Sequence, residues 1–540
     1  MSNQRLLLGS PRFEAGGDAA SGWQAVFASR EPSAAIAAVK GDFAVGIGDG
    51  EGRAFLAVDR FAVQTLCYRM VDGRLRFAER ADDLADADTP LDPQAIFDYL
   101  HFHAIPSPRT IFQGIHRLPA GHWARFEQGR LQVVPYWTPA FRSDATDFEG
   151  NKAAFLSLLE QAVARSLDGG KPGCFLSGGT DSSTVAGMIG RVAGRPAATY
   201  SIGFEASGYD EMAFARVAAA HFGTEHHEYY VTPDDVVQGV GRVAGHFDQP
   251  FGNSSALPAF YCAEFARQDG VTRLLAGDGG DELFGGNTRY AKQRVFDAYG
   301  WLPPFVRQNV LEPMLTRPAA SRLPVVRKAA SYVDQAREPM PDRLLKYNLL
   351  HRLGVDDVLT PEMQARIDPL APVAQQREVW QMARASSPID RTLAYDWRYT
   401  LAESDLPKVR GACGLADVGV AFPLLDDDLL ALSMRLPAHH KVRGLKLRWF
   451  FKQALTGFLP DEILRKRKQG FGLPFGVWAT QHDGLRTLAT DSLRSLATRG
   501  VVRPGFIDRL LREQLPAHPG YYGEMVWILM MLEQWLRRHR

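Results

Sequence analysis

Cysteine is scarce in this 540-residue chain, which contains four cysteines, Cys67, Cys174, Cys262 and Cys413. They are scattered, with no Cys-x-x-Cys pair and no spacing typical of metal ligands. The pattern therefore indicates neither a disulfide framework nor a zinc site. It is typical of a protein that is kept in a reducing cytoplasm.

An excess of charge of either sign is also missing, because 62 lysines and arginines stand against 61 aspartates and glutamates. This balance argues against a general surface for binding polyanions, so we expect no nucleic-acid partner. Local basic stretches are the electrostatic features that remain to be explained.

Long hydrophobic runs are absent as well. The apolar run near the start of the chain, Leu6–Leu8, is far too short for a signal peptide. The run Val526–Leu532 is followed by Glu533 and by the basic tail Arg537–Arg540. We therefore expect a buried last helix rather than a membrane span, no membrane partner and a cytoplasmic location.

The length of the chain predicts at least two domains, since single cores stop growing well below this size. Short β-like runs between glycine and aspartate turns, such as Phe43–Asp49 and Ala54–Arg60, predict a sheet-rich first domain. A polar stretch, Thr138–Gly150, separates this part from the rest of the chain. We place the two domains at residues 1–140 and 150–540.

From Lys152 onward, helical periods alternate with short apolar strands. The pattern predicts helices over residues 153–167, 184–192 and 212–222, with strands over 173–176 and 197–204. Such alternation is typical of an α/β domain with a doubly wound parallel sheet. Ligands of these sheets bind at the carboxyl ends of the strands, so we expect the site there.

The first predicted strand runs into the segment Cys174–Ser183, which reads CFLSGGTDSS. Gly178 and Gly179 allow the backbone to approach a phosphate closely, and Asp181 can hold Mg²⁺ against it. Hydroxyl groups come from Ser177, Thr180, Ser182 and Ser183. With the free N–H groups of the helix that follows, the segment predicts a pyrophosphate cradle. A Ser/Gly-rich turn that caps a helix is the alternative. The loop lacks the Gly-Lys-Thr/Ser ending of a Walker A motif, so it does not suggest transfer of a γ-phosphate.

A second glycine-rich loop, Ala276–Gly286, follows another apolar strand and carries Asp278, Asp281 and Glu282. Its glycines permit close approach of a ligand and bring the three acids around one point. Asp181 and Asp281, one from each loop, would supply hard oxygen ligands for Mg²⁺. An acidic solvated turn is the alternative for this loop taken alone.

Together, Leu176–Ser183 and Gly277–Gly286 resemble the asparagine synthetase family of ATP pyrophosphatases, which also includes β-lactam synthetases and lasso-peptide cyclases. The segments Thr199–Phe204, Tyr209–Glu211 and Gln249–Pro258 resemble it as well. The resemblance implies an N-terminal Ntn-type αββα domain like the glutamine amidotransferases, followed by an ATP-pyrophosphatase domain. It also implies ATP and Mg²⁺ as cofactors, cleavage of ATP between the α and β phosphates, and an acyl-adenylate from which an amine displaces AMP.

The same resemblance suggests roles for individual residues. It implies that Leu176, Ile202, Phe204 and Gly277 line the nucleotide pocket, although each is equally ordinary as the core at a strand end. The basic stretch Arg465–Pro474 looks like the family segment that carries the catalytic lysine. We therefore take Lys468, with Asp278 and Glu282, as the candidate catalytic residues, and Lys446 and Arg448 as further phosphate contacts. A solvated charged face is the alternative for the basic stretch.

Two departures from the family pattern bear on function. Glutamine-using members begin with a cysteine nucleophile after loss of Met, whereas Ser2 stands here, and no Arg-Gly-Pro-Asp or Asn-Gly-Glu string for gripping glutamine is present. We therefore expect the first domain to be a degenerate scaffold. In Val418–Asp426, Gly419 and Ala421 replace a glutamate and an arginine of the family, which predicts a roomier and less polar acceptor pocket.

These observations predict an ATP- and Mg²⁺-dependent, AMP-forming amide ligase without glutaminase activity. Its substrate would be a small-molecule or peptide carboxylate, and its nitrogen donor ammonia or an amine. An intramolecular ligase that closes a lactam or macrocycle, or a tailoring enzyme that amidates a sugar acid or peptide, is the first alternative. A non-catalytic nucleotide-binding scaffold is the second. Family members are often dimers, so a homodimer stays open.

Overall fold

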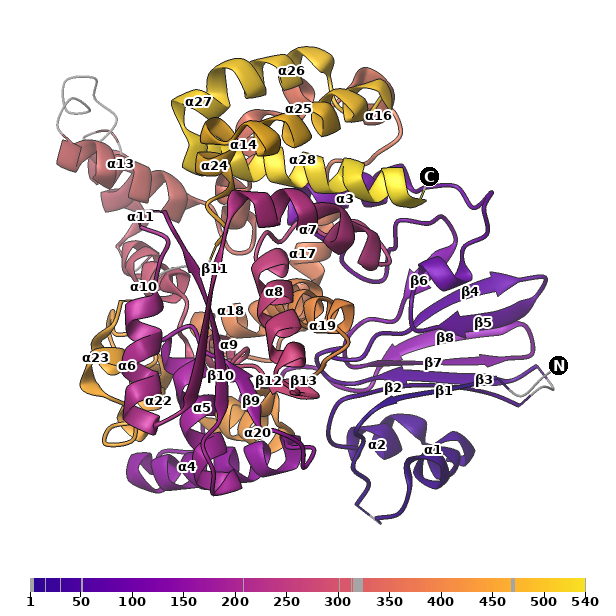
Figure 1. Ribbon diagram of the computed structural model, residues 1–540, viewed down its shortest axis with the longest axis vertical. Coiled ribbons are helices and arrows are strands. Elements are labelled where there is room, and N and C mark those ends of the chain that lie inside the picture. The colour runs from indigo at the N-terminus through magenta and orange to yellow at the C-terminus, as the bar shows by residue number, and fades with distance from the viewer. Residues whose placement is uncertain are drawn as a thin grey trace.

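The computed structural model describes residues 4–14, 16–29, 31–49, 52–206, 208–300, 302–311, 313, 324–467 and 472–539. Two of the positions discussed above, Ser2 and the candidate catalytic Lys468, lie outside these ranges. The described chain contains a sheet-rich N-terminal part and a larger part with its own parallel sheet, which lie side by side (Figure 1).

The N-terminal part is built on two antiparallel sheets. One has the order β1-β2-β3-β7-β8, with β1 at Arg5–Gly9, β2 at Phe43–Gly48, β3 at Ala54–Val58, β7 at His122–Glu127 and β8 at Arg130–Pro135. The other has the order β5-β4-β6, with β4 at Cys67–Val71, β5 at Arg74–Ala78 and β6 at Ile115–Arg117. The two β-like runs expected from the sequence correspond to β2 and β3.

Side chains alternate along β2 and so define the layers of this part. Phe43 and Val45 pack in one core with Trp23 of helix α1 (Ala19–Ala28), beside helix α2 (Pro32–Ala37). Ala44 points the other way, into a second core with Phe77 of the second sheet. This alternation is what the two-residue period of a strand requires when both faces are covered.

The larger part contains a five-stranded sheet of order β11-β10-β9-β12-β13, in which every pairing is parallel. Its strands are β9 (Gly173–Phe175), β10 (Ala198–Phe204), β11 (Glu225–Val231), β12 (Arg273–Leu275) and β13 (Gly419–Ala421). Helices α4 (Phe148–Ser166), α5 (Thr180–Ala193) and α6 (Met212–Phe222) lie on one side, and α8 (Ala256–Gln268) and α19 (Leu406–Leu415) on the other (Figure 1). The predicted fold class, α/β with a doubly wound parallel sheet, is confirmed.

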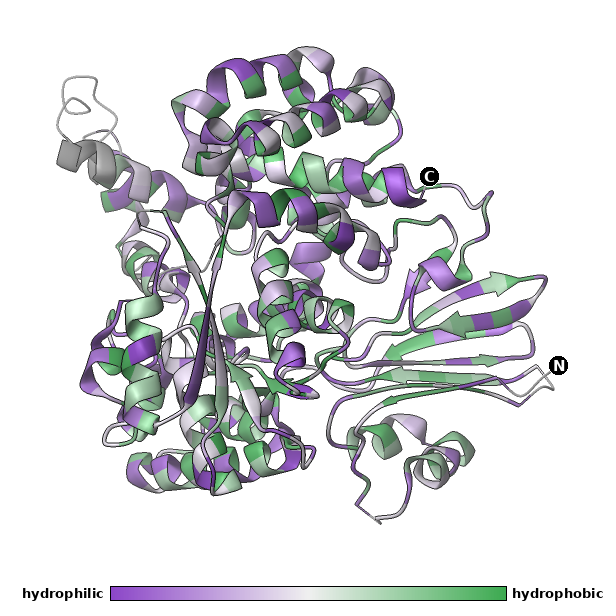
Figure 2. Cartoon of the chain, in the orientation of Figure 1, coloured by the Kyte–Doolittle hydropathy of each residue, from purple (hydrophilic) through white to green (hydrophobic). Residues whose placement is uncertain are grey.

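Hydropathy distinguishes the edge of this sheet from its centre. Figure 2 shows β11 purple over much of its length, because it begins with the polar run Glu225–Glu228. Its neighbour β10 is paler or green, and most of its residues are buried. The exposed edge therefore carries charge, which discourages pairing with another chain.

Most of the remaining chain is helical. It includes α7 (Pro233–His246), α10 (Thr288–Gly300), α13 (Pro324–Arg337), α17 (Ala371–Met382), α18 (Pro388–Asp396), α20 (Asp427–Arg435), α24 (Phe475–Gln481), α25 (Asp483–Thr498) and α28 (Pro519–His539). The apolar run Val526–Leu532 lies buried in α28, as predicted. Among the described residues, no helix is both long enough and apolar enough to cross a membrane.

Charged groups hold the two parts together. The acidic N-terminus of α20 faces the first domain, where Asp427 lies 2.7 Å from Arg60 and Asp428 lies 2.7 Å from Lys40. The connecting stretch is attached as well, since the N–H of Phe141 donates to the carbonyl of Arg384 at 2.9 Å. We infer that the first domain is docked rather than tethered loosely.

Candidate active site

The two glycine-rich loops meet because their strands are neighbours. β9 pairs with β12, so the loops that follow these parallel strands emerge at the same edge of the sheet. A Cβ on Gly277 would lie 2.7 Å from the backbone nitrogen of Ser182, and one on Gly280 would lie 2.5 Å from Oδ1 of Asp181. Glycine at these two positions is what allows the second loop to touch the first.

The first loop is shaped by its own hydroxyl groups. The N–H of Ser177 donates to Oγ of Ser182 at 3.1 Å, and the N–H of Gly179 donates to Oγ of Ser177 at 3.3 Å. Gly178 has a φ of +65°, and a Cβ there would lie 2.4 Å from the backbone nitrogen of Ala215 in α6. A side chain at Gly178 would therefore both strain the backbone and push the loop away from α6.

Three charged side chains from distant parts of the sequence converge at the mouth of these loops. One nitrogen of Arg448 lies 3.1 Å from Asp181 and 3.0 Å from Asp281. Burial alone would lower the pKa of Arg448, but the two carboxylates outweigh it and raise the pKa. The N–H of Arg448 donates to the carbonyl of Gly285 at 3.0 Å, which attaches its backbone to the second loop.

A second cluster of charged side chains lines the same cavity. Nζ of Lys408, on α19, lies 2.9 Å from Asp405 and 3.6 Å from Asp278. Burial raises the pKa of Asp278, and Lys408 opposes this shift. Burial would lower the pKa of Lys408, but Asp405 and Asp278 outweigh it and raise the pKa. Lys408 is therefore a stable positive charge.

Lys466 is a further cation at the first loop, and the sequence analysis missed it. Its Nζ lies 2.9 Å from Glu211, donates to the carbonyl of Gly178 at 3.3 Å and sits 4.6 Å from the ring centroid of Phe214. The family resemblance directed attention to Lys468, which lies outside the described residues. The basic character of the stretch was the signal that could have found Lys466 too.

These groups line one cavity of about 460 Å³, which we call the nucleotide cavity. Its walls include the candidate residues Leu176, Ser177, Gly179, Thr180, Asp181, Ser182, Ile202, Gly277, Asp278, Asp281, Glu282 and Arg448. Lys408 and Lys466 belong to the same walls. The cavity walls thus bring together residues that are far apart in the sequence, such as Leu176 and Arg448.

Comparison with known proteins agrees with this geometry. A family model described as asparagine synthase matches residues 154–537, and one described as a glutamine amidotransferase domain matches residues 25–137. The chain belongs to the asparagine synthase family. The resemblance inferred from the glycine-rich loops is confirmed, and this family member is an ATP-dependent carbon–nitrogen ligase.

Several relatives can be compared over part or most of their length. A Mycobacterium tuberculosis (strain ATCC 25618 / H37Rv) protein, provisionally named a glutamine-hydrolysing asparagine synthetase, is 26% identical over 82% of this chain and 68% of its own. Asparagine synthetase (glutamine-hydrolysing) 1 of Bacillus subtilis (strain 168) is 22% identical over 89% of this chain and 74% of its own. The amidase chyE of Penicillium rubens is 27% identical over 51% and 45%.

The donor set of this asparagine synthase family member suits the cofactors that the family implies. Asp181 and Asp281 are carboxylates that already face one point, as Mg²⁺ prefers. Arg448 lies at that point, and Lys408 and Lys466 line the same cavity, so cations that could bind phosphate oxygens are present. The residues therefore fit a magnesium-bound nucleotide.

Four of the proposed nucleotide contacts lie outside the walls of the nucleotide cavity. Ser183 is fully buried. Gly178 shapes the loop from behind, as described above. Phe204 is 2% exposed and packs edge-on against Trp478, with 6.0 Å between ring centroids. Lys446 has its Nζ 5.3 Å from the ring centroid of Trp449.

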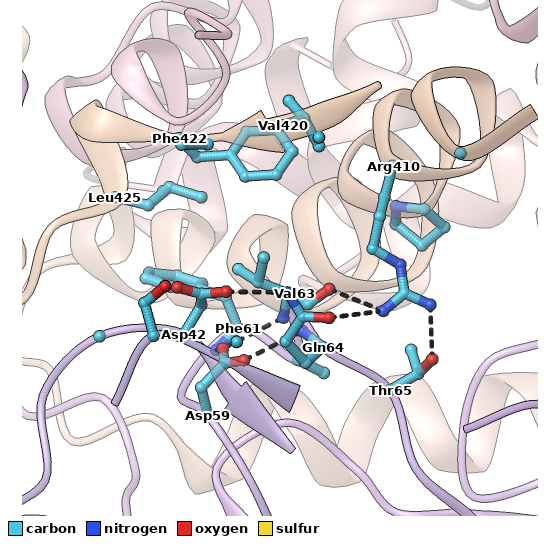
Figure 3. Close-up of a pocket in the computed structure, with 18 of the residues that line it drawn as sticks. Asp42, Asp59, Phe61, Val63, Gln64, Thr65, Arg410, Val420, Phe422 and Leu425 are labelled. Carbon is cyan, nitrogen blue, oxygen red and sulfur yellow. Dashed lines mark hydrogen bonds between the residues drawn. The ribbon is translucent and has the colours of Figure 1, made fainter. Parts of the chain in front are cut away.

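A larger cavity of about 600 Å³ lies between the two domains (Figure 3), and we call it the interdomain cavity. Gly419 and Ala421, expected in the acceptor pocket, line this cavity instead. Arg410 reaches from α19 across it and donates to the carbonyl of Val63 at 3.1 Å and to Oγ1 of Thr65 at 2.7 Å. The departure from the family pattern at residues 419–421 therefore concerns the domain boundary and not the nucleotide cavity.

Proposed function

We propose that this chain uses ATP to convert a substrate carboxylate into an acyl-adenylate, which ammonia or an amine then captures to form an amide. A carboxylate resists attack by amines because its leaving group would be oxide. Adenylation supplies AMP as a leaving group and releases pyrophosphate. The chemistry thus needs one site that stabilises a departing pyrophosphate beside the reacting carboxyl group.

The observation that supports the proposal best is the convergence of Asp181, Asp281 and Arg448 at the carboxyl edge of the sheet. When a nucleotide enters, the two carboxylates would exchange their contact with Arg448 for contacts with Mg²⁺. Mg²⁺ held by the two acids would neutralise phosphate charge and favour cleavage at the α phosphate. Arg448 would then contact phosphate oxygens.

The remaining charged residues have complementary places in this proposal. Lys466 anchors the carbonyl side of the first loop and keeps positive charge near the pyrophosphate. Lys408 is held by Asp405 and Asp278 in the wall of the same cavity, and it would attract a substrate carboxylate. We keep Lys468 as the candidate that stabilises the adenylate, and Glu282 as a candidate catalytic acid within the cavity wall.

We also propose that the first domain has no glutaminase activity. Position 2 is serine, and the strings that grip glutamine in the family are not found in the sequence. Glutamine hydrolysis is part of the names of two relatives described above, and we do not extend it to this chain. In this chain Arg60 and Lys40 of the first domain pair with Asp427 and Asp428 of the second.

Product analysis tests both parts of the proposal. Purified protein with MgATP, ammonium and aspartate, or with a panel of other carboxylates, should release AMP and pyrophosphate in equal amounts, measured by anion-exchange chromatography. Glutamine in place of ammonium should yield no glutamate above background. Release of ADP and orthophosphate would refute the adenylate, and stoichiometric glutamate would refute the loss of glutaminase activity.

A further inference from the structure

Three side chains that can bind a metal ion meet at the amino ends of the parallel strands, the edge of the sheet opposite the two glycine-rich loops. Glu225 and His227 lie at the start of β11, and Asp269 follows α8 shortly before β12. Nε2 of His227 lies 3.4 Å from Oε1 of Glu225 and 3.3 Å from Oδ2 of Asp269. These three atoms all lie within 4.8 Å of one another. We call the three residues the amino-edge cluster.

The strand register explains how the imidazole is positioned. Glu225 and His227 are two residues apart on β11, so their side chains project from the same face of the sheet. His227 pairs with Tyr200 of β10, and the two rings are stacked with 5.0 Å between centroids and 11° between planes. Phe265 of α8 packs edge-on against the imidazole, with 5.6 Å between centroids. The ring is therefore held between a strand and a helix.

The carboxylate of Asp269 is also held in place. The hydroxyl of Tyr200 donates to Oδ2 of Asp269 at 2.5 Å. Hydrogen bonds from Lys171 and Tyr200 lower the pKa of Asp269 below its ordinary value of 3.8, so this group is ionised at neutral pH. A further hydrogen bond that orients a ligating carboxylate is typical of metal sites in proteins.

Hydrogen bonding within the protein leaves the imidazole of His227 unexplained. Its Nε2 is buried and, among the described residues, has no hydrogen-bond partner, although the oxygens of Glu225 and Asp269 are close. A neutral nitrogen that turns its lone pair toward two carboxylates is repelled by them unless a cation lies among the three. Burial of Nε2 is no obstacle to such a cation, because an ion held by three side chains is itself shielded from solvent.

Lys171 shows that a cation is stable at this place. Its Nζ lies 2.9 Å from Glu225 and 2.6 Å from Asp269. The ammonium group pairs with the two acids but makes no hydrogen bond to Nε2 of His227. Its side chain is 28% exposed, so Lys171 can turn outward and remain solvated. A metal ion in its place would use all three ligand atoms.

The spacing and the donor types favour Zn²⁺. Zinc bonds of about 2.0–2.1 Å at tetrahedral angles place ligand atoms about 3.3–3.4 Å apart. The separations from Nε2 of His227 to the two carboxylate oxygens have these values. Zinc accepts a mixed set of imidazole and carboxylates with water in the fourth position, whereas Mg²⁺ and Ca²⁺ prefer oxygen ligands throughout.

We propose that the amino-edge cluster binds one Zn²⁺ ion through its imidazole nitrogen and one oxygen of each carboxylate, while Lys171 turns into solvent and water completes the coordination. The site lies at the opposite edge of the sheet from the proposed magnesium site and does not depend on the proposed function. The ion ties the start of β11 to the end of α8, so it stabilises the edge of the sheet.

Zinc titration of the full chain, in competition with a chromophoric chelator, tests the proposal. We expect one ion to bind per chain at this site and to raise the melting temperature by about 2 °C or more. His227→Phe keeps a ring stacked on Tyr200 but removes the nitrogen. It should weaken zinc binding at least about 100-fold, because losing a residue that merely orients a ligand already costs about 10- to 100-fold.

The neighbouring histidine provides the matched control. Nδ1 of His226 lies 3.0 Å from Oγ1 of Thr199, and His226 projects from the other face of β11. His226→Phe should therefore leave zinc affinity unchanged. Ca²⁺ in place of Zn²⁺ should give no change in melting temperature that His227→Phe abolishes.

A gain of affinity provides a test that misfolding cannot imitate. Lys171→Met removes the ammonium group with which zinc must compete, so it should strengthen zinc binding about 3- to 10-fold. Equal zinc affinity in the unmodified protein and in His227→Phe would overturn the proposal and reduce the cluster to an ion-pair network. Zinc binding by Lys171→Met but not by the unmodified protein would overturn it too, because Lys171 would then be the permanent cation.

Discussion

The nucleotide cavity and the interdomain cavity use charge in opposite ways. In the nucleotide cavity, side chains from far-apart segments converge on one point, as Asp181, Asp281 and Arg448 do. In the interdomain cavity, charges pair across the boundary, as Asp427 does with Arg60, or bind backbone, as Arg410 does with Val63. In the first arrangement, charged side chains lie where they can bind a ligand. In the second, they form ion pairs and hydrogen bonds that hold the two domains together.

This contrast teaches that size alone does not identify the site. The interdomain cavity is the larger of the two, yet several of its charged groups pair with protein partners, as Arg60 does with Asp427 and Arg410 with Thr65. The nucleotide cavity is smaller, but it lies at the carboxyl ends of parallel strands, and its walls combine acids with the cations Lys408, Arg448 and Lys466 beside the first glycine-rich loop. In the proposed function, the chemistry belongs to the second domain and the first has a structural role.

The comparison is tested most severely by Asp181→Asn. Removing one of the two converging carboxylates should lower the rate of AMP formation at least about 100-fold, because charge stabilisation of this kind contributes factors of that order. The rate is measured over a series of Mg²⁺ concentrations, with Asp417→Asn, a surface carboxylate that is 87% exposed, as the control. A rate equal to that of the unmodified protein would remove Asp181 from the magnesium site.

The interdomain cavity should respond in stability and not in rate. Asp427 lies 2.7 Å from Arg60 and accepts a hydrogen bond from the N–H of Gly41 at 2.6 Å. Asp427→Asn should lower the free energy of unfolding by about 2 kcal/mol, less than a fully buried pair because both side chains are slightly exposed. Urea unfolding measures this change. A reduced AMP rate per folded molecule would contradict the division of roles between the cavities.

A pH series sharpens the same comparison at a second docking point. Asp248 accepts from the N–H of Ala81 at 2.9 Å and lies 3.5 Å from Arg117. Burial would raise the pKa of Asp248, but Arg117 and the N–H of Ala81 outweigh it and hold the pKa below its ordinary value of 3.8. A carboxyl pKa that is lower in the folded state stabilises the protein above the unfolded pKa, and this stabilisation is lost as pH falls through the folded one.

Asp248→Asn should therefore cost about 1–2 kcal/mol of unfolding free energy near pH 7 and near pH 5, and progressively less below about pH 4. Urea unfolding of both proteins at each pH measures the difference. A cost that stays constant down to the acid transition would show that Asp248 acts through shape and not through charge.

Much of the second domain could be predicted because local pattern and fold agree there. The helix expected over residues 212–222 is observed as α6 with the same bounds. The helix expected to start at residue 184 starts at Thr180, because the hydroxyl and acid residues of the loop form its first turn. The meeting of the two loops could be predicted too, since parallel strands bring their carboxyl ends to one edge.

The cationic half of the site could be predicted only in part. Arg448 was suggested by family resemblance. Its place between Asp181 and Asp281 depends on tertiary packing, because Arg448 is far from both of them in the sequence. Lys466 was missed, because nothing in the basic stretch Arg465–Pro474 marks which of its cations lies inward. Gly419 and Ala421 line the interdomain cavity, which could not be predicted because sequence order does not reveal which side of β13 faces the domain boundary.

The smallest expected effect concerns the first domain and would break the comparison if it proved large. Ser2→Ala removes the one hydroxyl at the position where glutamine-using relatives of the family place their nucleophile. We expect no change in AMP formation with ammonium and no change in the background release of glutamate from glutamine, measured by coupled glutamate dehydrogenase. A loss of glutamate release on this substitution would make the first domain a working glutaminase, and its charged boundary would then have to be explained as a passage between two active centres.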